Sequence, residues 1–301
     1  MGDSERDHCV GMIGLGAMGA GMATRLIQQG FPLVAFDVDP DKNDQVAKQG
    51  AHIAECPADV ARSASRVICM VDTSSQVEEV VLGPAGLKSR ARSGDVLLCM
   101  STVELAAILA CHAGLADIGA ELIDAPVSGG PGAAESGKLV VYAGATDAGM
   151  HTSRPILDAI ADAVFHMGSL GSGFAAKMVN NILFHVGSVA VIEAMILGTK
   201  AGLDPGKMID VLSRSTGDSV ALRARAPRFL SRDFTGVPLR IAYREMVMET
   251  DFGRAQQVPL LLASVAEQVH AMGMARGLGE EEGSALVKVY EEIVGVQLAH
   301  R

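Results

Sequence analysis

Short apolar runs alternate with segments of helical periodicity over the first half of the chain. The runs end in polar or glycine positions, which is typical of buried strands followed by turns. They cover residues 10–13, 33–36, 67–71, 96–100, 122–123 and 140–143. Segments of helical character lie between them at 19–29, 76–81 and 104–119. Strands that alternate with helices in this way predict an α/β domain with a parallel sheet, doubly wound with helices on both faces.

The pattern changes after about residue 170. Apolar positions then continue nearly all round a helix from 172 to about 201, as in a buried helix, and Ser172 is a plausible N-cap. Asp204-Pro205 predicts the start of the next helix, and 247–257, 260–272 and 284–297 are further helical segments. We therefore predict two domains, residues 1–169 and 170–301, with the second all-helical and joined to the first by the long helix.

Composition narrows the classes of function. Apolar residues make up 49% of the 301 positions and charged residues 20%, as in ordinary globular proteins. The net charge of −10 argues against nucleic acid as a partner. The longest apolar stretch is interrupted by His185 and Glu193, so no membrane partner is expected. The five cysteines form no CxxC pair and no signal segment precedes the first strand, which favours reduced thiols in a cytoplasmic protein.

A glycine loop follows the first predicted strand. Gly14 permits a tight turn, Gly16 lets the backbone approach a pyrophosphate, and Gly19 allows the following helix to pack closely on the strand. The amino terminus of that helix offers N–H groups and the positive end of its dipole to phosphates. Together with the strand and helix around it, the loop predicts a Rossmann-type dinucleotide site. The cofactor-binding residues expected there are Gly14, Leu15, Gly16, Ala17, Met18 and Gly19.

Asp37 ends the second predicted strand, about twenty residues beyond the loop. A carboxylate at this place accepts hydrogen bonds from the ribose hydroxyls of NAD and repels the 2′-phosphate of NADP. Val38 and Asp39, which follow, supply no cation for that phosphate. NAD is therefore favoured over NADP as the cofactor, with Asp37 in the binding site.

Two further segments carry candidate chemistry. In DAPVSGGPGAAESGKL, residues 124–139, Ser128 and the two glycines after it offer a hydroxyl and exposed N–H groups that suit a carboxylate. In GSGFAAKMVNN, residues 171–181, Lys177, Asn180 and Asn181 share one helix face. A lysine removed from water gives up its proton more readily, which makes it usable as a general acid and base.

The loop GLGAMG and these two segments resemble the signature motifs of the β-hydroxyacid dehydrogenase family, in the same order and over essentially the whole chain. The resemblance implies a Rossmann domain joined by a long helix to an all-helical domain. It also implies an NAD-dependent oxidoreductase that interconverts a short hydroxy-carboxylate and its aldehyde or keto acid. The family usually forms homo-oligomers, so pairing between copies of this chain is expected.

The resemblance implies roles for matching residues. Lys177 is the expected catalytic residue. The expected substrate-binding residues are Ser128, Gly129, Gly130 and Asn181. Further cofactor contacts are expected from Met70, Val71 and Thr102, and from Arg244. Arg244-Glu245 stands where many members have Lys-Asp, so the charges are kept while the shape of the cation changes.

Other chemistries find less support. No histidine or cysteine has metal-ligand spacing and no GxSxG is present, so neither a metal nor a serine hydrolase is expected. His185 lies two turns beyond Lys177 and could border the pocket, but a buried core histidine is the favoured interpretation. The alternatives that stay open are a non-catalytic dinucleotide-binding scaffold and an imine reductase on the same fold.

Overall fold

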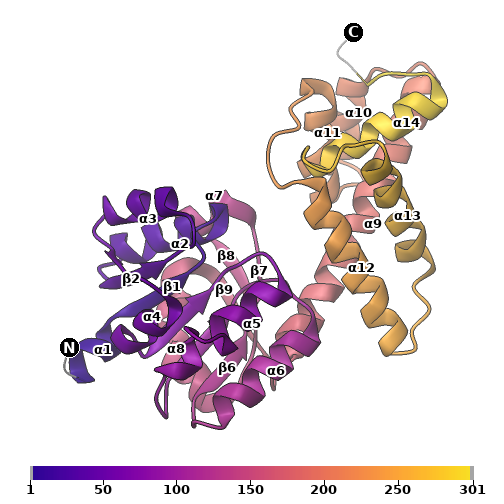
Figure 1. The fold of residues 1–301 in the computed structure, drawn as a ribbon. Coiled ribbons are helices and arrows are strands. Elements are labelled where there is room, and N and C mark those ends of the chain that lie inside the picture. The colour runs from indigo at the N-terminus through magenta and orange to yellow at the C-terminus, as the bar shows by residue number, and fades with distance from the viewer. Residues whose placement is uncertain (1–2, 299–301) are drawn as a thin grey trace. The chain divides into compact units, whose positions relative to one another are not determined.

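The structure is a computed structural model that describes residues 3–298, and Figure 1 shows its elements in chain order. The chain forms two compact units, which divide between Lys177 and Met178. Each unit has its own hydrophobic core.

The first unit is built on a sheet of nine strands among the described residues. The strands are β1 (Val10–Ile13), β2 (Leu33–Phe36), β3 (His52–Ile53), β4 (Arg66–Cys69), β5 (Val96–Cys99), β6 (Glu121–Asp124), β7 (Val127–Ser128), β8 (Leu139–Gly144) and β9 (Ala161–Gly168). Their order is β3-β2-β1-β4-β5-β6-β8-β7, with β9 paired to β8. The pairs from β3 to β6 are parallel, whereas β8 runs antiparallel to β6 and β7.

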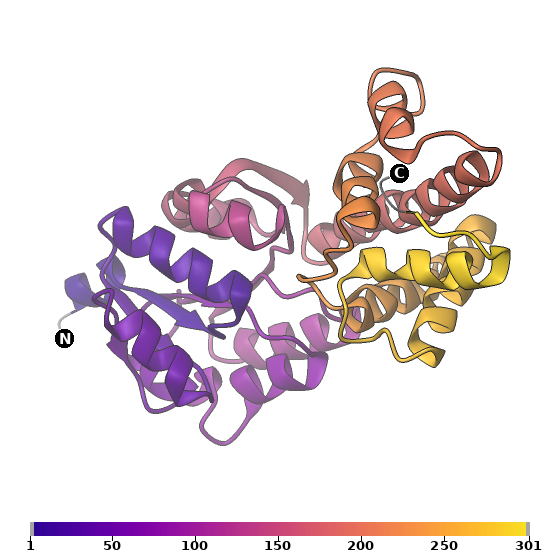
Figure 2. The same ribbon diagram turned by 90° about the horizontal axis from the view of Figure 1, so that it is seen from above.

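Helices cover both faces of this sheet (Figure 2). They are α1 (Asp3–His8), α2 (Ala17–Gln28), α3 (Pro40–Ala47), α4 (Pro57–Ser63), α5 (Ser74–Leu82), α6 (Leu105–Ala116), α7 (Gly130–Ser136) and α8 (Asp147–Ile160), with a 3-10 turn η1 (Leu87–Ser89). Helix α2 packs against α7 and α8, while α5 packs against α6 and η1. The core between these layers contains the alternating strand residues Val10, Met12, Ile68 and Leu98. The prediction of a doubly wound, Rossmann-type unit is confirmed.

The second unit is helical throughout its described residues. Its elements are α9 (Ser172–Lys200), which begins in the first unit, and α10 (Pro205–Leu212), α11 (Val220–Ser231), α12 (Leu239–Ala255), α13 (Leu261–Ala275), η2 (Gly283–Leu286) and α14 (Val287–Val294). Asp204 caps α10 as predicted, because its carboxylate accepts from the Lys207 N–H at 2.8 Å. The helix predicted at 247–257 begins eight residues earlier, at Leu239, because the polar positions of its first two turns hide the periodicity.

The amino terminus of α9 is capped by a residue of the sheet and not by Ser172. One oxygen of Asp124, at the end of β6, accepts from the Gly171 N–H at 2.7 Å, and the other accepts from the Phe174 N–H at 2.6 Å. The Ser172 hydroxyl instead donates to the Ser169 carbonyl, so the N-cap prediction for Ser172 is wrong. A cap supplied by a strand fifty residues away fixes the start of the long helix on the carboxyl edge of the sheet.

Gly173 makes this attachment possible. A Cβ atom added there would lie well inside 3.0 Å of the carbonyl oxygens of Tyr142 and Asp124, so only glycine fits. Helix α9 is also the one described helix that could cross a membrane by length and mean hydropathy. Half of its most apolar window is buried inside the protein, as in the core helix of a globular unit.

Candidate active site

The glycine loop joins β1 to α2 with the geometry that its spacing predicts. Gly14 has φ +89° and lies against the Met70 carbonyl, so no side chain fits there. A Cβ at Gly19 would meet the Gly14 carbonyl, because helix and turn pack without a gap. A Cβ at Gly16 would meet nothing within 4 Å, and no side chain caps α2. The loop therefore leaves an open cradle of backbone N–H groups that fits a pyrophosphate.

Asp37 lies beside this loop at the carboxyl end of β2 and is buried. Its Oδ2 accepts from the Leu15 N–H at 2.6 Å and its Oδ1 from the Asp39 N–H at 2.9 Å. The carboxylate thus ties the second strand to the glycine loop. Lys42 on α3 places its ammonium 3.7 Å from Oδ1 and 3.8 Å from Asp39. The sequence interpretation found no cation immediately after Asp37. It missed Lys42, because the first turn of α3 returns this lysine to the Asp37 carboxylate.

Met70, Val71 and Thr102 lie at the same edge of the sheet as the glycine loop. Met70-Val71 follows β4, and both residues contact the position of Gly14. The Val71 N–H donates to the Ser101 hydroxyl at 2.9 Å, which joins the segment after β4 to the segment after β5, where Thr102 lies. Ser101 is 2% exposed and was not singled out by its sequence. A ligand in a doubly wound sheet binds at this carboxyl edge.

Lys177 and the Ser128 loop meet in the first unit. The Lys177 ammonium donates to the Val127 carbonyl at 2.7 Å and lies 3.4 Å from the Ser128 Oγ. Tyr142 Oη also lies 3.4 Å from Ser128 Oγ. Lys177 is 8% exposed, and Gly129 and Gly130 have φ +127° and +74°. The positive φ values explain why two glycines follow Ser128. The two segments singled out by sequence, fifty positions apart, are thus in contact.

Asn181 lies one turn beyond Lys177 on α9 and belongs to the second unit. Its Nδ2 donates to Glu245 Oε2 of α12 at 2.9 Å. One turn further, His185 Nδ1 lies 2.7 Å from Glu249 Oε1. The sequence interpretation noted Glu245 only as the neighbour of Arg244 and did not notice Glu249 or the pairing with α9. The signal was available, since Asn181 and His185 are four positions apart, as are Glu245 and Glu249.

Arg244 also lies on α12 in the second unit, while the glycine loop lies in the first. Its contact with the cofactor therefore remains a prediction. The same holds for the catalytic and substrate-binding roles of the other residues.

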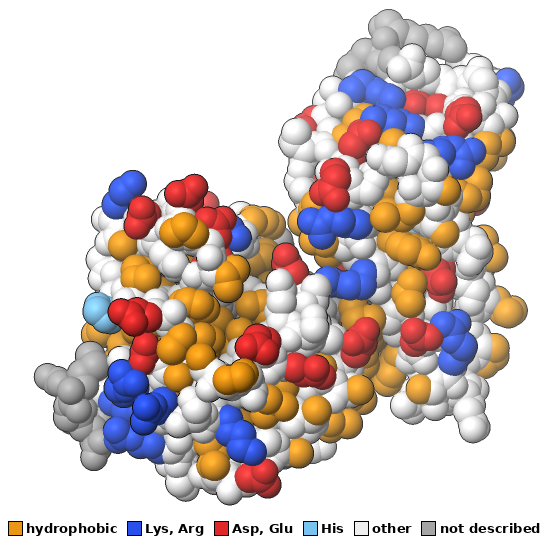
Figure 3. All heavy atoms as spheres, in the orientation of Figure 1, with side chains coloured by type: hydrophobic (Ala, Val, Ile, Leu, Met, Phe, Trp, Pro, Cys, Tyr) orange, Lys and Arg blue, Asp and Glu red, His pale blue; other side chains and the backbone are white. Residues whose placement is uncertain are grey.

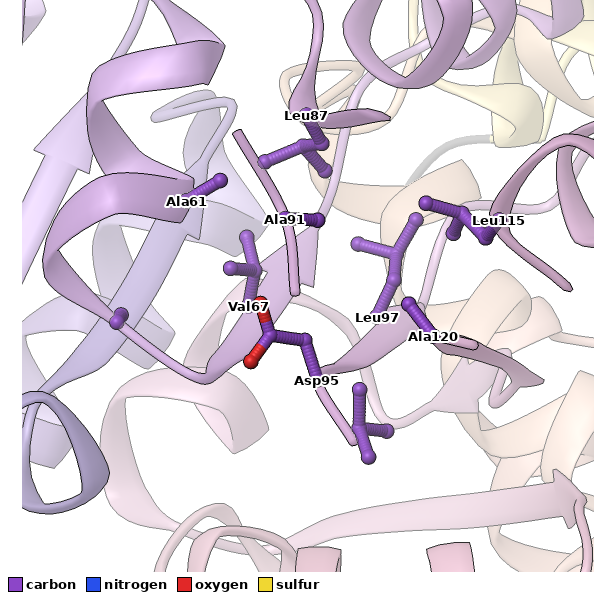
Figure 4. A pocket seen from close by; sticks show the side chains of 10 residues that line it. Ala61, Val67, Leu87, Ala91, Asp95, Leu97, Leu115 and Ala120 are labelled. Atoms are coloured by element: carbon purple, nitrogen blue, oxygen red, sulfur yellow. The ribbon is translucent and has the colours of Figure 1, made fainter. Parts of the chain in front are cut away.

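Two hollows in the first unit contain none of the predicted residues. The one in Figure 4 is lined by aliphatic side chains around Asp95 and has a volume of about 20 Å³. Its lining is apolar apart from Asp95, so it offers no convergent set of polar groups to a ligand. The other, of about 460 Å³, is lined by Arg6, Arg66 and Arg92 at the amino ends of β4 and β5. Figure 3 shows basic side chains gathered there, beside the N-terminal helix.

Comparison with known proteins identifies the class. Residues 9–168 match the family model described as the NAD binding domain of 6-phosphogluconate dehydrogenase. Residues 171–290 match the model described as NAD-binding of NADP-dependent 3-hydroxyisobutyrate dehydrogenase. The fold, the glycine loop and these matches define a nicotinamide-dinucleotide-binding oxidoreductase.

Individual relatives make the class more specific. The chain is 35% identical to 2-(hydroxymethyl)glutarate dehydrogenase of Eubacterium barkeri, over 98% of this chain and 99% of that protein. It is 34% identical to mitochondrial 3-hydroxyisobutyrate dehydrogenase of Rattus norvegicus, over 94% and 87%. The solved 3-hydroxyisobutyrate dehydrogenase of Salmonella typhimurium superposes with a TM-score of 0.86 at 28% identity, over 93% and 99%. The chain belongs to the β-hydroxyacid dehydrogenase family, as its motifs predict. It is therefore an oxidoreductase of this family.

Proposed function

We propose that this protein is an NAD-dependent dehydrogenase of a short hydroxy-carboxylate in which Lys177 is the general acid and base. The observation that carries the proposal is the contact of the buried Lys177 ammonium with the Ser128 loop at the carboxyl edge of the sheet. Hydroxyl, backbone N–H and ammonium groups within a few ångströms of one another suit a substrate that carries both a carboxylate and a hydroxyl.

The bound dinucleotide supplies the acceptor for a hydride from the carbinol carbon. As that C–H bond breaks, the neutral Lys177 amine takes the hydroxyl proton, so the alcohol becomes a carbonyl and both electrons leave with the hydride. In the reverse direction the Lys177 ammonium returns the proton and stabilises negative charge on the oxygen. Ser128, Gly129 and Gly130 hold the carboxylate, and Asn181 orients the reacting oxygen.

The choice of NAD over NADP rests on the charges beside β2. A 2′-phosphate would approach Asp37 and Asp39, and Lys42 is the one cation paired with them among the described residues. Two carboxylates against one ammonium leave a net repulsion of the phosphate. We expect kcat/KM to be higher with NAD. Lys42→Ala should lower the remaining activity with NADP further while activity with NAD changes little. A preference for NADP in the unchanged protein would contradict this assignment.

Replacement of Lys177 tests the mechanism. Lys177→Met keeps an unbranched side chain that is one atom shorter but removes the proton-transfer group, and kcat should fall roughly 10²- to 10⁴-fold. Lys177→Arg is the matched variant that keeps the charge but does not give up a proton near neutral pH, and it should be similarly inactive. Binding of the dinucleotide, followed by fluorescence titration of NADH, should persist in both. Near-normal turnover of hydroxy acids by Lys177→Met would refute the role.

A spectrophotometric screen identifies the substrate. Short hydroxy acids are offered with NAD and with NADP, and cyclic imines with NADH and NADPH. Reduction of imines without oxidation of any hydroxy acid would favour the imine-reductase alternative. Dinucleotide binding without turnover would favour the scaffold alternative.

The assembly that we propose is a homo-oligomer in the cytoplasm. Val179, Leu183 and Leu197 lie along one face of α9 and are 60%, 74% and 71% exposed. Exposed apolar side chains of this kind along one helix suit a second copy of the chain. All five cysteines are free, as expected in a reducing compartment. Light scattering should give a mass above 31.2 kDa, and Leu183→Asp should lower it.

A further inference from the structure

Four polar side chains form a ladder between α9 and α12 within the second unit. Asn181 and His185 supply one side, and Glu245 and Glu249 the other. Besides the bonds of Asn181 to Glu245 and of His185 to Glu249, the His185 Nε2 lies 3.8 Å from the same Glu245 oxygen that accepts from Asn181. His185 therefore lies between two carboxylates, and one of them holds the amide of Asn181.

The ladder is almost completely removed from water. The side chains of Glu249 and His185 are 0% and 5% exposed, and that of Glu245 is 16% exposed. Two carboxylates one helical turn apart repel each other, and burial makes them costly unless donors face them. An aliphatic pair would fill this part of a helical core at less cost. The presence of charged groups here thus calls for a role other than packing.

The ladder fixes which way the Asn181 amide points. A carboxylate only accepts hydrogen bonds, so the Nδ2 edge must face Glu245. The Oδ1 on the opposite edge accepts from Asn180 Nδ2 at 3.1 Å. Nδ2 carries a second hydrogen, whose direction is set once these two bonds are made. The position of the Glu245 carboxylate thus decides where Asn181 can donate.

We propose that His185 is a positioning residue for Asn181, and this inference rests on the function proposed above. Held by Glu249, His185 keeps the Glu245 carboxylate in place. Glu245 in turn holds the Asn181 amide so that its second N–H is directed at the reacting oxygen. Glu249 has a positioning role as well, because its carboxylate holds the His185 imidazole through Nδ1.

The other groups that face His185 do not substitute for it. His270 of α13 lies edge-on to the His185 ring with 5.9 Å between ring centroids. Its Nδ1 lies 2.8 Å from the Ala266 carbonyl. Burial lowers the pKa of His270 to about 4, so it is neutral at neutral pH and brings no charge to the glutamates. The buried Arg225 of α11 pairs with Glu282.

A double-mutant cycle on kcat tests the inference. His185→Ala should lower kcat roughly 10- to 100-fold, the scale of a misplaced group in an active site, and should change KM by less than about threefold. In an Asn181→Ala background the same substitution should lower kcat by less than about twofold, because His185 acts through Asn181 and the amide that it positions is then absent. His185→Gln, which can reach one carboxylate but not both, should behave as His185→Ala and provides a milder change to the core.

Val189→Ala is the matched control, since Val189 is a buried core residue of α9 one turn beyond His185. It should lower stability without lowering kcat. The inference is overturned if the losses from His185→Ala and Asn181→Ala multiply, or if Val189→Ala lowers kcat as much as His185→Ala. Failure of the unchanged protein to oxidise any hydroxy acid would instead overturn the proposed function, and the inference with it. An unchanged kcat in Asn181→Ala would overturn the role of Asn181 and the inference together.

Discussion

The cap that Asp124 provides for α9 predicts an unusual dependence of stability on pH. The carboxyl is fully buried, and burial raises its pKa from 3.8 to about 6, although the N–H groups of Gly171 and Phe174 act in the opposite direction. The folded protein therefore binds this proton more tightly than the unfolded chain does. The stability contribution of the group is complete only well below 3.8, the pKa in the unfolded chain, and it is lost as the pH rises through about 6.

The magnitude follows from the two pKa values. The difference between 3.8 and about 6 corresponds to about 3 kcal/mol between the protonated and ionised forms. Of this, about 2 kcal/mol of stability is lost between pH 4 and pH 7.5, because the carboxyl of the unfolded chain is already partly ionised at pH 4. The expected sign is opposite to that of a carboxylate in an exposed ion pair, which stabilises more as the pH rises.

Urea unfolding of the unchanged protein and of Asp124→Asn, measured across this pH range, isolates the effect. The asparagine does not titrate, so the difference in unfolding free energy between the two proteins should fall by about 2 kcal/mol from pH 4 to pH 7.5. The exposed Asp210, replaced in the same way, controls for the general loss of one charge. A difference for Asp124→Asn that is flat, or that grows with pH, would refute the reasoning.

Two further predictions concern packing and thiols. Gly173→Ala should destabilise the protein by about 1–3 kcal/mol in thermal or urea unfolding, because the added Cβ meets backbone carbonyls. Gly132→Ala is the control and should not destabilise the protein, because its Cβ meets nothing within 4 Å. Equal losses of stability in the two variants would contradict the close approach of α9 to the sheet. Alkylation near pH 8 should modify Cys56 first in the native protein, because this cysteine is partly exposed. Burial raises the pKa of Cys69 to about 12 and that of Cys111 to about 11, so these thiols should react more slowly. Mass spectrometry that finds Cys69 labelled as fast as Cys56 would contradict this prediction.

Local sequence was sufficient where chemistry and geometry are set by neighbouring residues. The strands at 10–13 and 33–36 were predicted with their observed bounds, because apolar runs between turns specify buried parallel strands. The spacing of Gly14, Gly16 and Gly19 determined the turn, since the need for glycine at these positions arises from the backbone of the loop and its immediate neighbours. Elements without such a signal were missed. Strand β9 is largely exposed and pairs with β8 alone among the described strands, so its sequence lacks the continuous apolar run of a buried strand.

Tertiary structure decided what depends on partners far away in the chain. Lys177 and Asn181 could be placed on one helix face from their spacing, but only folding brings Lys177 to Val127 and Asn181 to Glu245. The cap of α9 by Asp124 and the pairing of His185 with Glu249 join residues that no periodicity links. The sequence by itself determined a dinucleotide-binding fold and the residues able to carry proton chemistry. The buried contacts that orient those residues were decided by the fold, because desolvated polar groups must find their partners wherever packing brings them.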